Sequence, residues 1–155
     1  MSRRIALLVA CAAGALLLAA CGTVSVAVAT QHWASANSFL QASWDLDHDA
    51  RQVHTAIARH RSPSAIRTAC LELFQDANGV NTDLLPTPDA QLTTLLSSTV
   101  DAYVHAAAVC DEESTSASAL VAVDHQLVVA HGDLIATLLR EFAVSNHPVR
   151  ILGIP

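Results

Sequence analysis

The chain has 155 residues, of which 52% are hydrophobic but only 4% aromatic, and it contains just 5 glycines and 5 prolines. This composition favours an all-α fold over a β-sandwich, because Ala and Leu form helices well and a sandwich would need regular turn residues. No lysine occurs, which excludes Schiff-base and P-loop chemistry, and the formal charge of −6 argues against nucleic acid as a partner.

A positively charged start and a long apolar run give the N-terminus the pattern of an export signal. Arg3 and Arg4 precede an uncharged stretch over residues 5–29. Either residues 1–20 are a signal peptide that is removed, or the whole stretch stays as a membrane-spanning signal anchor with the arginines in the cytoplasm. Both interpretations place everything after residue 30 outside the cytoplasm.

The signal-peptide interpretation rests on a motif inside the apolar run. Leu18-Ala19-Ala20-Cys21 resembles the lipobox of bacterial lipoproteins, with Leu three positions before a cysteine and two small residues between them. The resemblance implies cleavage before Cys21, lipidation of its thiol, and attachment to membrane lipid on the extracytoplasmic side of the cell membrane. The residues that follow are apolar, which favours the signal anchor, but the match at all four lipobox positions outweighs this. We therefore expect a lipoprotein, with residues 21–33 as an apolar tether.

Two of the four cysteines lie beyond the N-terminal segment. Cys11 would leave with the signal peptide and Cys21 would carry the lipid. Cys70 and Cys110 are then an even pair in an exported domain, which favours a disulfide over two buried free thiols. Neither has a second ligand at the spacing of a zinc site. Closing this loop of about 40 residues would stabilise the fold by about 4 kcal/mol.

Residues 34–145 predict an up-down four-helix bundle, because apolar residues recur at steps of three and four and the breaks between them are short. The expected helices span residues 34–60, 63–85, 88–110 and 116–144, and residues 146–155 form an apolar tail. One conflict arises at the expected disulfide. In a straight hairpin Cys70 lies opposite residue 103, about 10 Å of helix away from Cys110, which is beyond disulfide reach. A broad turn or a bend at Asn78-Gly79 would resolve it.

Part of this layout also resembles small secreted or lipid-anchored helical proteins of actinobacteria. Those proteins often have a Cys early in one helix, a P-x-P turn, and a Tyr seven residues before a second Cys. Here these features are Cys70, Pro86-Thr87-Pro88, Tyr103 and Cys110. The resemblance implies a helical bundle but no particular activity.

Eight histidines raise the question of a metal site. The pair Asp101 and His105 falls on the solvent side of its helix, as do Asp45 and His48. Asp124 and His131 fall on the apolar side of the last helix, where they would be partly buried and would pair directly or through water. A polar pair that sets helix register is one interpretation, and half of a transition-metal or haem site completed by another helix is the alternative.

The two tryptophans belong to a separate stripe on the first expected helix, made of Trp33, Leu40 and Trp44. Tryptophan favours the membrane interface, so the stripe predicts that this helix rests on the lipid surface. Burial of the stripe beneath the C-terminal tail is the alternative.

Neither a G-x-S-x-G nor an H-E-x-x-H motif occurs, and there is no glycine-rich phosphate loop. We therefore predict a non-enzymatic binding or envelope-interaction module without a cofactor, whose partner is an envelope protein or a small apolar ligand. A metal- or haem-binding bundle is the alternative. Without residues 1–20 the chain has 6 basic and 14 acidic residues, a net charge of −8, so its attachment to the membrane must be hydrophobic.

Overall fold

The computed structural model describes residues 24–145, which form five helices and no strand. The helices are α2 (Val26–Ala36), α3 (Phe39–Ala58), α4 (Pro63–Leu84), α5 (Ala90–Glu112) and α6 (Ala117–Ser145). The all-α prediction is therefore confirmed. The expected signal peptide, Cys21 as the expected lipid acceptor, and the expected C-terminal tail lie outside the described residues.

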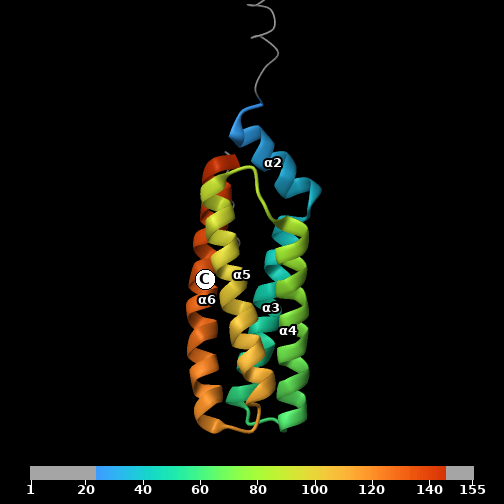
Figure 1. Ribbon diagram of the computed structural model, residues 1–155, viewed down its shortest axis with the longest axis vertical. Coiled ribbons are helices and arrows are strands. Elements are labelled where there is room, and N and C mark those ends of the chain that lie inside the picture. The colour runs from blue at the N-terminus through green and yellow to red at the C-terminus, as the bar shows by residue number, and fades with distance from the viewer. Residues whose placement is uncertain (1–23, 146–155) are drawn as a thin grey trace, which may run out of the picture.

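The long helices α3 to α6 run side by side in alternating directions, and α2 crosses one end of them (Figure 1). Each long helix packs on the next one along the chain, and α3 also packs on α6, which closes the ring. α2 packs on α6 and, over a smaller surface, on α3. The connections between the long helices are only a few residues long, which makes chain neighbours antiparallel. Since the direction alternates from α3 through α4 and α5 to α6, the first and last of these helices are antiparallel as well.

The core follows the predicted steps of three and four residues. On α4 and α5 the residues at these steps are all buried: Ile66, Cys70, Leu73, Ala77, Val80, Leu84, Leu92, Leu96, Thr99, Tyr103, Ala106 and Cys110. On α6, Leu120 and Leu138 are only half-buried. Thr137 lies inside instead, where its hydroxyl is 3.0 Å from the hydroxyl of Thr99 on α5.

The single helix expected over residues 34–60 is wrong, because the chain breaks between α2 and α3. Asn37 ends α2, and its side-chain amide donates to the carbonyl oxygen of Trp33 at 2.8 Å. Ser38 then adopts a left-handed conformation with φ 52°. The break turns Phe39 into the core, where its ring centroid lies 5.2 Å from that of Trp33. Residues 26–33, expected as a tether, belong to α2.

Side-chain oxygens cap the starts of α4 and α5. Ser62 caps α4, accepting from the backbone N–H of Ala65 at 3.3 Å, and Pro63 fills the first turn. α5 is capped by Asp89. The Asp89 carboxylate accepts from the backbone N–H of Leu92 at 2.7 Å and receives two hydrogen bonds from Arg140 of α6, at 3.0 and 2.9 Å.

The predicted disulfide between Cys70 and Cys110 is confirmed, with a Cα–Cα distance of 5.9 Å and both residues fully buried. α4 continues as one α-helix through Asn78-Gly79. The link over residues 85–89 continues past the end of α4 before α5 begins (Figure 1). α5 is thereby displaced along the bundle, and the broad turn brings Cys110 level with Cys70.

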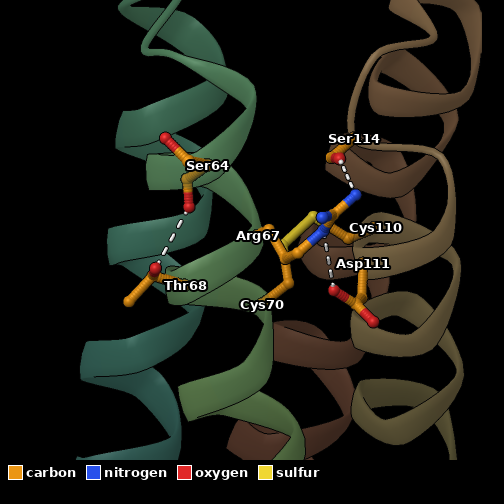
Figure 2. Close-up of a disulfide and its surroundings, with 7 residues drawn as sticks. All are labelled: Ser64, Arg67, Thr68, Cys70, Cys110, Asp111 and Ser114. Atoms are coloured by element: carbon orange, nitrogen blue, oxygen red, sulfur yellow. Dashed lines mark hydrogen bonds and ion pairs between the residues drawn. A yellow bond between two sulfur atoms is a disulfide. The ribbon is translucent and has the colours of Figure 1, made fainter.

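Arg67 of α4 reaches across to α5 beside the disulfide (Figure 2). Its Nε lies 3.2 Å from the carboxylate of Asp111, and its Nη2 donates to the hydroxyl of Ser114 at 3.3 Å. The start of α4 is therefore held to the end of α5 by a covalent bond and by polar contacts.

Candidate functional site: the α3–α6 groove and the outer face of α6

A groove of about 280 Å³ runs between α3 and α6. Ala50, Leu127 and Val128 give it apolar walls, and its polar lining consists of Asp47, Arg51, His54 and His131. An apolar pocket with a few polar groups is the usual form of a small-molecule site. The lining of this groove has that composition.

Two His–Asp pairs connect the helices along this groove. His54 of α3 lies 2.5 Å from Asp124 of α6, and His131 of α6 lies 3.0 Å from Asp47 of α3. Each helix contributes one His and one Asp, seven residues apart. Because the helices are antiparallel, the histidine of one pair lies on α3 and the histidine of the other lies on α6. The two pairs are separated by about two helical turns along each helix. The arrangement fixes the axial register of α6 against α3.

The sequence prediction for Asp124 and His131 is corrected in one respect. The two residues do not pair with each other but with His54 and Asp47, which the sequence analysis did not select. They are also less buried than expected, with 33% of the Asp124 side chain and 48% of the His131 side chain exposed. The sequence contained one indication of this pairing. Asp47 and His54 are seven residues apart, and so are Asp124 and His131.

Asp47 is the most connected carboxylate of the groove. Besides His131, it pairs with Arg51 one turn along α3 at 2.8 Å. Tyr103 of α5 lies behind it in the core, and its buried hydroxyl has no hydrogen-bond partner among residues 24–145. Burial raises the pKa of Tyr103, and the nearby carboxylates of Asp47 and Asp133 raise it further. The phenol therefore stays protonated.

A His–Asp pair activates a nucleophile only when a hydroxyl or thiol lies within reach of the imidazole. The lining residues include neither Ser, Thr nor Cys. Nowhere in residues 24–145 do three His, Cys, Asp or Glu side chains gather in a way that could hold a metal ion.

A second cleft, of about 240 Å³, lies between α3 and α4 and is acidic. Asp45, Asp76 and Asp83 line it. Next to it, burial raises the pKa of Asp49 to about 6, and the facing Asp76 contributes to the same shift. The cleft concentrates negative charge on the side of the bundle away from α6.

The outward face of α6 has the opposite character. We call Val121, His125, Val128, Gly132, Ile135 and Leu139 the α6 outer seam, since they follow one another at steps of four and three residues. Val121, Val128 and Leu139 are 70%, 64% and 56% exposed. None of the exposed positions of α6 carries a carboxylate or a guanidinium group. Apart from His125, the seam is thus an apolar strip on an acidic protein.

The tryptophan stripe predicted from the sequence is wrong as a single face, because the break at Asn37–Ser38 places its members on two helices. Trp33 of α2 is half-buried against Phe39. Leu40 and Trp44 remain one turn apart on α3, and they are 43% and 50% exposed. Within the described part of the chain no helix has the length and apolarity needed to cross a membrane.

The chain matches no protein-family model, no curated protein and no solved structure.

Proposed function

We propose that the protein is a lipid-anchored interaction module on the extracytoplasmic side of the cell membrane. The lipobox-like sequence ending at Cys21 supports the anchor, and a disulfide between Cys70 and Cys110 fits an oxidising compartment. The described residues begin next to the end of the bundle that α2 covers (Figure 1). The anchored end of the molecule is therefore the α2 end, where Leu40 and Trp44 are the exposed residues best suited to touch lipid.

The observation that supports an interaction role most directly is the α6 outer seam. Monomeric soluble proteins rarely expose a contiguous apolar patch of this kind unless it is a binding surface. The residues from 121 to 139 extend over about 27 Å of helix, which is comparable with the length of a helix–helix contact. An enzyme would instead need a recessed site with a nucleophile or a general base near a substrate.

Intact-mass measurement of the membrane-extracted protein tests the anchor. We expect loss of residues 1–20, a diacylglycerol adduct on Cys21, and a mass lower by two hydrogens for the disulfide. Cys21→Ser should abolish the adduct, whereas Cys11→Ser should leave the mature mass unchanged. A full-length mass without lipid would show that residues 5–29 remain as a signal anchor.

Photo-crosslinking in intact membranes tests the interaction role. A photoreactive amino acid at Val128, on the seam, should give covalent protein adducts. The same group at Ser98, an exposed position of α5, is the matched control and should give none. Equal labelling at the two positions would contradict a role for the seam.

A further inference from the structure

We infer that the α6 outer seam binds a second copy of this chain, so that two molecules associate side by side and in parallel. The inference specifies the partner of the interaction module proposed above, and its parallel geometry rests on the anchor of that proposal.

The spacing of the seam points to a helix as its partner. Its residues advance by four, three, four, three and four positions, which is the a/d pattern of a two-helix seam. The inner face of the same helix has this spacing at Val123, Leu127, Ala130 and Leu134, all of them buried against the other helices of the bundle. α6 therefore has two faces built for helix packing, and only the inner one is occupied within the described residues.

The charge distribution points to a second copy. Two molecules that each carry a net charge of −8 repel one another over most of their surfaces. The acidic cleft of α3 and α4 would place carboxylates against carboxylates. The exposed positions of α6 hold no carboxylate, so this face allows two copies to approach without opposed like charges.

A lipid surface is a poorer occupant of the seam. A helix that lies in the headgroup region typically has Lys or Arg on its polar side, which attract anionic lipid. α6 has a single basic residue, Arg140, and its guanidinium is engaged with Asp89. The net negative charge of the bundle would oppose approach to an anionic leaflet.

The direction of association follows from the position of the anchor. The N-terminal end of the described chain and the C-terminal end of α6 lie at the same end of the bundle (Figure 1). A two-fold axis parallel to α6 keeps both anchored ends at one membrane, whereas an antiparallel pair would separate them by the length of the bundle. Attachment to one surface also raises the effective concentration of each copy for the other.

In this parallel arrangement each seam residue meets its own counterpart across the two-fold axis. Val128 packs on Val128 and Ile135 on Ile135. Gly132 lies between them, and a Cβ built there would meet no other atom of the chain within 4 Å, so the second helix has room to approach. His125 is the one polar residue of the seam and would fix its register.

Cysteine crosslinking of the full-length protein in its own membranes tests the geometry. Val128→Cys and Ile135→Cys, made singly, should each form a disulfide-linked dimer under mild oxidation, because residue meets like residue. Ser98→Cys on α5 and the unsubstituted protein are the controls and should stay monomeric. A dimer at Gly132→Cys without one at positions 128 and 135 would indicate an antiparallel pair and would overturn the parallel arrangement.

A charge placed in the seam provides a second test. Val128→Glu in the Ile135→Cys background should lower the crosslinked fraction at least about tenfold, because two carboxylates would face each other. Leu71→Glu in the same background is the matched control, since Leu71 of α4 is as exposed as Ile135, at 41% against 43%. We expect it to leave the crosslinked fraction unchanged.

Two further outcomes would overturn the inference. Adducts of another mass in place of a dimer would assign the seam to a different protein. Absence of any crosslink, together with protection of the cysteine at position 128 from a water-soluble maleimide, would assign it to lipid. The intact-mass measurement tests lipidation of Cys21 independently of the crosslinking. Failure of the anchor proposal can therefore be distinguished from failure of the dimer proposal.

Discussion

Asp49 is a carboxylic acid whose ionisation is unfavourable in the folded protein. Its side chain is only 17% exposed, and burial raises its pKa to about 6. Asp76 and Glu72 of α4 contribute to this same rise, while the neighbouring His48 acts in the opposite direction. In the unfolded chain the same carboxyl ionises at its ordinary, lower pKa. Protonated Asp49 therefore makes its full contribution to the free energy of unfolding below about pH 4. This contribution is lost as pH rises through about 6, where Asp49 ionises in the folded protein.

We accordingly expect Asp49→Asn to raise the melting temperature at pH 7 and to leave it unchanged at pH 4. The amide fills the same space without requiring a charge in this partly buried position. Thermal unfolding followed by circular dichroism from pH 4 to pH 8 is the measurement. Asp101→Asn, at an exposed position of α5, is the control and should keep the wild-type pH dependence. An unchanged pH dependence in Asp49→Asn would contradict this account.

At the same scale, the sequence identified two of the four residues that form the His–Asp pairs between α3 and α6. Asp124 and His131 stood out because a charged and an imidazole side chain near an apolar helix face need partners. The identity of those partners could not be predicted, since it depends on which helix lies alongside α6 and in which register. His54 and Asp47 become partners only because α3 closes the ring of helices.

At the scale of single helices, the end of α3 shows a stabilising motif with one unfavourable residue. The backbone N–H of Arg61 donates to the carbonyl of Ala56, and that of His60 donates to Ile57, each at 3.0 Å. This is the Schellman arrangement, in which the residue after the cap is left-handed and is usually Gly. Here that residue is His60, with φ 48°.

His60→Gly should therefore stabilise the protein by about 1 kcal/mol, because Gly adopts this conformation without the steric cost that a Cβ brings. Chemical denaturation at constant pH measures the change. His60→Ala keeps the Cβ and separates this effect from loss of the imidazole, so we expect it to give no gain. Equal stabilisation by both variants would show that the imidazole, and not the backbone, is unfavourable.

The break between α2 and α3 shows why helix boundaries were harder to predict than helix faces. Residues 34–60 contain neither Gly nor Pro, so their apolar periodicity suggested one continuous helix. The break depends on the packing of Phe39 against Trp33 and on the amide of Asn37, which are tertiary and capping contacts. The faces of α4 and α5 were predictable because their core residues keep one periodicity over the whole helix.

At the scale of the whole molecule, the displacement of α5 relative to α4 was the feature that the sequence left open. Residue counting alone placed the two cysteines about 10 Å apart along the bundle. The link over residues 85–89 removes this difference by extending beyond α4. In it Thr87 is buried, and its backbone N–H donates to the Thr93 hydroxyl at 3.0 Å. The path of such a link depends on these local contacts, which no periodicity encodes.

The disulfide is the connection whose loss should affect the whole molecule most. It closes a loop of 40 residues, so its removal increases the entropy of the unfolded chain by an amount equivalent to about 4 kcal/mol. This is a large part of the stability of a domain of this size. Because Cys70 and Cys110 sit among buried apolar residues of α4 and α5, the helices should still form without it.

We expect Cys70→Ala/Cys110→Ala to unfold at a markedly lower denaturant concentration while keeping the helical circular dichroism of the native protein. Dithiothreitol should destabilise the unsubstituted protein to a similar extent and have no effect on the double variant, which is the internal control. If the double variant lost less than about 1 kcal/mol, the interhelical contacts of Arg67 and the core would account for the α4–α5 pairing by themselves. The disulfide would then contribute little to the stability of the bundle.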